Sequence, residues 1–291
     1  MKQLSVKLPW KLAHIVFLGD VQWAGAKSGG TALDHLKRTI ADALEWEKAG
    51  DTVRFVGMGD YTDFLSPSNR QRLRGANLYD TAEEVIDHKA LELTEEIYDL
   101  ALKPTKGKWL GLVEGHHLHE LKDGTTTDMR LCEMLDAQFL GTTGLLRLVF
   151  QRGYPGCRVP DVIWFHHRVG NGMTGYYPLT RLEKKAAEWE GVDVFAIGHT
   201  TKKAIEFQNK VIPKWNPKTD LTHRKVILLG TGGYSKTYVL GAMRGRIPRG
   251  GYAEQKMLNA AIIGSPVLHI RPRRQKLNGV ESHSVDVTAE G

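Results

Sequence analysis

Five apolar segments of this 291-residue chain each end at an aspartate or a histidine. A short apolar run predicts a buried strand, and the C-terminal ends of strands are where α/β proteins place their ligands. The acidic ends come first along the chain and the imidazoles come last. The segments are HIVFLGDVQ with Asp20 and Gln22, VRFVGMGDYTD with Asp60 and Asp63, WLGLVEGHH with His116 and His117, DVIWFHH with His166 and His167, and DVFAIGHT with His199.

A single aspartate after a strand is often a turn former or a helix cap. Packing alone does not readily explain five such segments in succession. A pair of divalent cations would require several carboxylates and imidazoles arranged in this way. Carboxylates and imidazoles suit Mn, Fe, Zn or similar ions such as Ni and Co, with Mn favoured, rather than a soft-thiolate site.

Helical spacing between these segments predicts a layered α/β fold with both sheet faces covered. Helices are expected over residues 31–50, 81–102, 128–137 and 178–190, and a short strand over 147–151 before a YPGC turn. After residue 198 the pattern changes to short strands with turn signals between them, which predicts an antiparallel sheet. Those strands are expected at 204–208, 225–230 and 236–241.

The composition limits the class of protein. No apolar run approaches the roughly 18 residues needed to span a bilayer. Two cysteines, Cys132 and Cys157, make no disulfide framework, and a reducing cytoplasm is the expected compartment. We expect a single catalytic domain over residues 1–275 and a polar, disordered tail over 276–291.

The formal net charge of +7 and the pI near 9.3 suit a polyanionic partner such as DNA or RNA. Solvated loop charges are the alternative for any single basic cluster. Arg70 and Lys202 follow metal-motif segments closely, so they are the better candidates for contacting phosphates. Trp23 and Tyr61 could stack on a base, although packing in the core or at its rim is the favoured role for such aromatics.

The ordered set of motifs, D-x-[H/Q], G-D-x-x-D, G-[N/H]-H, a strand-end histidine and G-H, resembles the calcineurin-like metallophosphoesterases. The resemblance covers about residues 13–240, and its departures are similar in style to small phosphoesterases of phages and bacteria. It implies an α-β-β-α sandwich of two packed mixed sheets and a pair of divalent cations. Asp60 would bridge the cations, and the other ligands would be Asp20 and Gln22 at one site and His116, His166 and His199 at the other.

The same resemblance places His117 beside the scissile phosphate. As a protonated imidazole it could stabilise the developing charge or protonate the leaving oxygen. Asp63 would hydrogen-bond that imidazole and raise its pKa. His167 stands where many family members have glycine, so it is either a support for the ligands or a substrate contact.

Four positions depart from the family pattern. Gln22 replaces the commoner histidine, His116 stands where asparagine is usual, Leu118 replaces an acidic residue, and Thr201 replaces a second histidine. The site of Asp20 and Gln22 is therefore poor in ligands. One tightly held and one labile cation are expected.

Two classes of function follow. The first is a dinuclear metal-dependent phosphoester hydrolase, favoured as a phosphodiesterase or nuclease that acts on nucleic acid or a nucleotide-like substrate through a metal-activated hydroxide. A phosphomonoesterase is the alternative within this class, but Phe64 stands where protein phosphatases of the family have an arginine. The second class is a binding or scaffold protein that kept the fold and lost catalysis.

Overall fold

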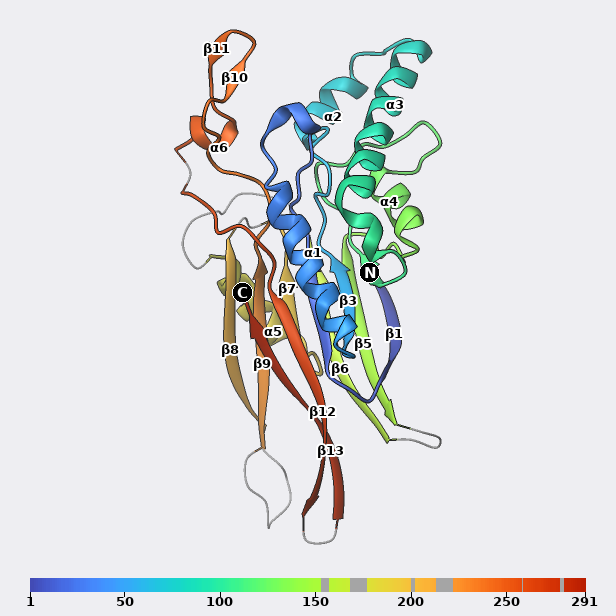
Figure 1. Ribbon diagram of the computed structural model, residues 1–291, viewed down its shortest axis with the longest axis vertical. Helices are drawn as coiled ribbons and strands as arrows, with labels where there is room; N and C mark the ends of the chain where they lie inside the picture. Colours follow the sequence, from blue (N-terminus) through green and yellow to red (C-terminus); the bar gives the residue numbers. More distant parts are fainter. Residues whose placement is uncertain (153–156, 168–176, 200–201, 213–221, 258, 278–279) are drawn as a thin grey trace.

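A computed structural model describes the chain apart from residues 153–156, 168–176, 200–201, 213–221, 258 and 278–279. Two mixed β-sheets pack against each other, and helices lie on their outer faces (Figure 1). This architecture agrees with the predicted layered α/β fold with two packed mixed sheets.

The first sheet has five strands in the order β13-β12-β2-β3-β4. Strands β2, β3 and β4 run parallel to one another, whereas β12 is antiparallel to both β2 and β13. The strands are β2 (Ala13–Leu18), β3 (Thr52–Gly57), β4 (Trp109–Leu112), β12 (Val267–Leu277) and β13 (Val280–Glu290).

The second sheet has six strands in the order β1-β5-β6-β7-β9-β8. The central strands β6, β7 and β9 are parallel, while β8 is antiparallel to β9, as expected for the region after residue 198. The strands are β1 (Lys2–Pro9), β5 (Thr143–Arg152), β6 (Cys157–His166), β7 (Val194–Ile197), β8 (Lys203–Ile212) and β9 (Thr222–Thr231); β10 (Met243–Arg244) and β11 (Ile247–Pro248) form a separate short hairpin.

The helices are α1 (Leu33–Lys48), α2 (Pro67–Arg74), α3 (Asp80–Ile97), α4 (Thr127–Leu135), α5 (Tyr177–Glu188) and α6 (Tyr252–Gln255), with a π-helical turn at Tyr98–Leu102 and 3-10 turns at Ala26–Ser28 and Lys103–Thr105. Four of these helices match the expected ones within a few residues. Helix α2 begins at a Ser66 cap, whose hydroxyl accepts the backbone N–H of Asn69. In the described part of the chain, no helix has the length and apolar character needed to cross a membrane.

Strand β2 shows why the apolar runs are continuous. Ile15 and Phe17 pack between the two sheets, whereas Val16 and Leu18 point to the other face and pack under the helices. A strand covered on both faces needs apolar residues at every position. Because β2, β3 and β4 are parallel and β6 and β7 are parallel, their C-terminal ends gather at one end of the molecule, which is where ligands bind in such folds.

Two expectations about the C-terminal region are wrong. Residues 236–241 form no strand and instead begin an irregular projection. The region 276–291, expected to be a disordered tail, ends β12 and supplies β13, whose pairing runs from Leu277↔Val280 to Val267↔Glu290. Its alternation of polar and apolar residues suits a strand with one exposed face. Residues 154–156 of the YPGC turn lie outside the described residues, and Cys157 begins β6.

The packing between the sheets predicts how much stability is lost when a buried side chain is shortened. Phe17 is fully buried there, so Phe17→Ala removes a large side chain and leaves a cavity. We expect it to lower the free energy of unfolding by about 3–5 kcal/mol in urea denaturation followed by circular dichroism. Phe207→Ala is the control, because Phe207 is 48% exposed, and it should cost below about 1 kcal/mol. Equal losses in the two variants would contradict this packing.

Candidate metal centre

The strand ends present their polar residues through an unusual backbone conformation. Asp20, Asp60 and His199 have positive φ angles of 47°, 53° and 64°. Non-glycine residues rarely adopt this left-handed region, and each such residue stores strain. The sharp turns at the ends of β2, β3 and β7 direct these side chains toward a common point instead of letting the chain continue outward.

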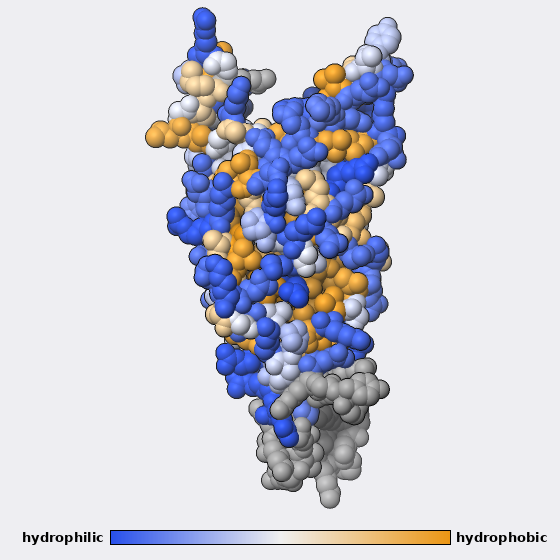
Figure 2. Space-filling view, turned by 45° about the vertical axis from the view of Figure 1, so that its right-hand side comes forward, coloured by the Kyte–Doolittle hydropathy of each residue, from blue (hydrophilic) through white to orange (hydrophobic). Residues whose placement is uncertain are grey.

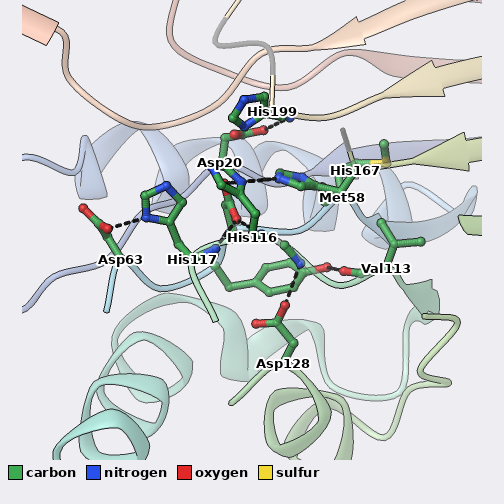
Figure 3. A network of polar contacts seen from close by, with 12 residues as sticks. Asp20, Met58, Asp63, Val113, His116, His117, Asp128, His167 and His199 are labelled. Carbon is green, nitrogen blue, oxygen red and sulfur yellow. Dashed lines mark hydrogen bonds and ion pairs between the residues drawn. The ribbon is translucent and has the colours of Figure 1, made fainter. Parts of the chain in front are cut away.

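Four side chains meet at that point, and the three histidines among them are labelled in Figure 3. One potential ligand atom from each of Asp60, His116, His167 and His199 lies within 4.8 Å of the others. Asp60 Oδ2 is 2.8 Å from His116 Nδ1 and 3.2 Å from His167 Nε2, and these two nitrogens are 2.9 Å apart. One carboxylate and three imidazoles make a donor set typical of a transition-metal site.

The details of this set fit a divalent cation. Asp60 Oδ1 accepts the backbone N–H groups of His116 at 2.6 Å and His117 at 3.0 Å, whereas the buried Oδ2 faces the imidazole nitrogens of His116 and His167. Ligand atoms that share one octahedral cation at about 2.1 Å are about 3 Å apart. The spacing of the nitrogens around Asp60 Oδ2 is close to this value, so a shared cation would satisfy all three atoms.

His167 is oriented from behind by the main chain. Its Nδ1 lies 2.6 Å from the carbonyl oxygen of Met58, and that nitrogen donates its hydrogen. When the imidazole is neutral, the lone pair of Nε2 is directed at Asp60 and His116, which is how second-shell hydrogen bonds fix a ligating imidazole. Burial lowers the pKa of His167, but the charge of Asp60 outweighs burial and raises this pKa to about 9.

The buried charges around Asp60 compensate one another. Burial opposes ionisation of Asp60, yet the positive charge of His167 and the hydrogen bonds of His116 hold the Asp60 pKa well below its usual range. Burial lowers the pKa of His116, which favours the neutral form of the imidazole, the form that can ligate. The pocket therefore combines an ionised carboxylate with imidazoles that differ in their protonation.

Asp20 lies beside the four-residue cluster and belongs to the same polar network. Its Oδ2 accepts the backbone N–H of His199 at 2.9 Å, while the buried Oδ1 has no partner. Burial raises the pKa of Asp20 to about 7. The main chain of Gln22 belongs to the same network, because its N–H donates to the carbonyl oxygen of Asp60 at 2.9 Å. Ligation by the Gln22 side chain stays a prediction.

The structure places His117 and Asp63 in contact, as the sequence predicts. His117 Nδ1 donates to Asp63 Oδ1 at 2.6 Å. Burial lowers the pKa of His117, but the hydrogen bond to Asp63 and the nearby carboxylates raise it above the ordinary value overall. This leaves Nε2 of His117 as the nitrogen available to carry or release a proton.

Close backbone approach holds the centre together. A Cβ at Gly115 would lie 2.1 Å from the Asp60 nitrogen, and a Cβ at Gly233 would lie 2.5 Å from the Asp20 Cβ. The Gly115 N–H donates to Asp128 Oδ2 at 2.7 Å, and burial raises the pKa of Asp128 to about 7. Sequence reasoning missed Asp128, since it reads as an ordinary residue of the first turn of α4.

The structure does not bring the predicted ligand His166 into the cluster, and His167 lies there instead. His166 Nδ1 contacts the Thr143 hydroxyl at 2.9 Å and the carbonyl oxygen of Thr142 at 2.8 Å, and its ring stacks on Trp164. Successive side chains of a strand point to opposite faces. The face of Trp164 and His166 is turned toward α5, so the next residue, His167, is the one that enters the centre.

The two aromatic residues considered as base contacts belong to the core, which is the role that the sequence favours for them. Tyr61 is fully buried, and its hydroxyl donates to the Val113 carbonyl oxygen at 3.0 Å. Trp23 is only 4% exposed, and its Nε1 donates to Glu96 Oε2 at 3.1 Å. Neither ring is available for stacking on a base, so packing decided both positions.

Arg70, predicted as a phosphate contact, holds the main chain around His116. Its Nη1 donates to the carbonyl oxygens of Leu65, His116 and Leu118 at 3.1, 2.7 and 2.8 Å. This guanidinium therefore fixes the main chain that presents His116. Lys202 is exposed just beyond residues 200–201, which lie outside the described part, and its contact with substrate stays a prediction.

Comparison of the sequence with models of known protein families finds no match, and comparison with curated proteins finds none. The interpretation of the centre therefore stands on its own geometry and on the order of its motifs.

The two adjacent histidines at the end of β6 give a matched test of the centre. His167→Ala removes a ligand atom beside Asp60, whereas His166→Ala removes an imidazole of the same type that faces away. We expect His167→Ala to weaken Mn²⁺ or Zn²⁺ binding by at least about tenfold in isothermal titration calorimetry. His166→Ala should stay within about threefold of the unsubstituted protein, and the opposite order would refute the assignment.

Cation binding should release protons. Since the pKa of His167 is about 9 in the metal-free protein, its imidazole is protonated at neutral pH and has to lose that proton before it ligates. Apparent affinity should therefore rise by up to about tenfold per pH unit below pH 9 and level off above it. Calorimetry in buffers of different ionisation enthalpy counts the protons, and a value of zero at pH 7 would contradict this arrangement.

Proposed function

We propose that this chain is a metal-dependent phosphoester hydrolase of the calcineurin-like type, acting as a phosphodiesterase or nuclease. The observation that carries the proposal is the meeting of Asp60, His116, His167 and His199, with imidazole nitrogens gathered around the buried Oδ2 of Asp60. These ligands come from the ends of four strands in two different sheets. The layered fold and the order of motifs along the chain support the same assignment.

The four clustered residues would hold one cation, and Asp20 with Asp60 and Gln22 would hold a second. Such cations polarise a phosphoryl group and lower the pKa of water, which makes hydrolysis possible at neutral pH. The unsatisfied Oδ1 of Asp20 supports a second site, because a buried carboxylate oxygen without a partner is costly. Asp60 lies between the two groups and would serve both.

The chain itself supplies a proton donor. His117 is held by Asp63 through Nδ1, so a proton carried on Nε2 is free to move to the leaving oxygen of the substrate. The hydrogen bond to Asp63 and the nearby carboxylates raise the pKa of His117, which favours the protonated form of this imidazole. The backbone N–H of His117 also donates to Asp60 Oδ1 at 3.0 Å, which couples the donor to the metal ligands.

A diester is the favoured substrate. The excess of Lys and Arg over Asp and Glu suits a polyanion. Phe64 occupies the position where the related protein phosphatases carry an arginine, and its ring packs edge-on against His119 at 5.1 Å between centroids. An apolar ring there gives no contact for the terminal oxygens of a monoester.

The proton donor can be tested separately from the metal ligands. With added Mn²⁺, the protein should hydrolyse bis-p-nitrophenyl phosphate, and His117→Ala should lower kcat by about 10²- to 10⁴-fold while the metal content is unchanged. Asp60→Asn should lose both activity and metal. His88→Ala is the control, since His88 is exposed on α3 and should keep full activity.

Two outcomes would contradict the proposal. Loss of metal from His117→Ala would make this residue a ligand instead of a proton donor. Absence of Mn²⁺-dependent turnover on both monoesters and diesters in the unsubstituted protein would leave a binding protein with the fold and the metal site but without catalysis.

A further inference from the structure

Residues 236–262 leave the core and return to it at adjacent points of the metal centre. Gly233, whose Cα lies against Asp20, forms bridges with Ile263 and Gly264. The Gly264 N–H donates to the Gly233 carbonyl oxygen at 2.9 Å, and the Tyr234 N–H donates to the Asp20 carbonyl oxygen at 2.9 Å. Both ends of this excursion, called the basic arm below, are therefore anchored beside Asp20.

The basic arm is a folded projection. It contains the β10–β11 hairpin and α6, and its described hydrogen bonds include Arg249 N–H to the Ala242 carbonyl and Ala261 N–H to the Thr237 hydroxyl, both at 3.0 Å. In Figure 1 it rises at the upper left, at the end of the molecule where β2 and β3 finish. Figure 2 shows two projections at this end with a recess between them.

Apolar side chains are exposed along the basic arm. Leu240 and Met257 are 104% and 87% exposed, and several others are at least half exposed. Exposing apolar surface forgoes about 25 cal/mol per Å², so a concentration of such residues marks a contact surface. The exposed apolar residues are Tyr238, Leu240, Met243, Ile247, Met257 and Ile262.

Basic side chains lie among these apolar ones. Lys236, Arg246, Arg249 and Lys256 are exposed on the basic arm, and Glu254 is its one acidic residue. A surface with this excess of positive charge complements a polyanion. Single strands are bound without sequence preference by a positive surface that also carries aromatic side chains on which bases stack. Tyr238, which is 50% exposed, is an aromatic side chain of this kind on the basic arm.

We propose that the basic arm binds a single-stranded nucleic acid and leads its backbone to the metal centre. The cations would contact phosphates, and the exposed apolar side chains would contact bases. This inference rests on the proposed function and extends it, since it names a polymeric strand as the substrate. Anchoring at Gly233 and Gly264 places the binding surface next to Asp20, so a bound strand has its phosphates beside the ligands.

The test removes three charges from the basic arm and compares a matched control. The arm variant is Arg246→Ala/Arg249→Ala/Lys256→Ala, and the control is Lys7→Ala/Lys106→Ala/Lys184→Ala, in which three exposed cations on β1, the β4 approach and α5 are removed. Binding of a fluorescein-labelled oligodeoxythymidylate is measured by anisotropy in EDTA, over a series of salt concentrations. Melting curves and metal content establish that both variants fold.

We expect the arm variant to bind at least about tenfold more weakly than the unsubstituted protein and the control to bind within about twofold. The slope of log affinity against log salt should become shallower by about 2 in the arm variant alone, since each lost phosphate contact contributes about 0.7 for a single strand. Equal affinities in the arm and control variants would overturn the inference. So would failure of the unsubstituted protein to bind the oligonucleotide, which would assign the apolar surface to a protein partner.

Hydrolysis separates this inference from the proposed function. With Mn²⁺, the arm variant should keep the unsubstituted rate on bis-p-nitrophenyl phosphate, because the small substrate does not reach the basic arm, while its kcat/KM on the oligonucleotide falls. If the unsubstituted protein hydrolyses neither substrate but the arm variant still loses binding, the hydrolase proposal fails and the nucleic-acid surface stands.

Discussion

A carboxylate buried where two sheets meet requires positive charge or hydrogen-bond donors around it, and Asp60 collects both from distant parts of the chain. Two backbone N–H groups bind its Oδ1, and imidazoles of His116 and His167 lie beside Oδ2. An isolated buried charge would cost several kcal/mol, so these contacts matter for folding as well as for any chemistry. The loop after β4 and the end of β6 are held in place by the same atoms that would bind a cation.

Backbone strain at the strand ends is concentrated at the same centre. Asp20, Asp60 and His199 all sit in the left-handed region, where each costs on the order of 1–3 kcal/mol. Glycine would adopt these angles without strain, but it would remove the carboxylate or imidazole. Elsewhere in the centre glycine is used where two main chains come close, as at Gly115 and Gly233. At this site, strained backbone conformations lower stability, and they position the side chains of the centre.

Much of the architecture was predictable because strong local patterns coincide with burial. Fully apolar runs such as β2 need cover on both faces, and this requirement predicts the layered fold. The structure differs from the sequence prediction at the start of the basic arm and at β13, and the reasons are opposite. Residues 236–241 have strand-forming composition but find no neighbouring strand, whereas polar residues 280–290 gain order from pairing along the whole of β12. Both outcomes depend on tertiary partners, which a local pattern does not contain.

The sequence motif indicates His166, but His167 is the residue that lies in the centre. This difference shows how precisely a motif can locate a site. Sequence order places the histidine pair at the end of β6, but the side that each residue faces depends on strand register against β5 and β7. A shift of one residue in that register would have sent His166 to Asp60 and His167 toward α5. Burial of Phe165 between the sheets fixes the register, because Trp164 then faces α5 and the residue two positions beyond Phe165 enters the centre. The motif therefore specifies the strand end, and the packing of its hydrophobic neighbours selects the ligand.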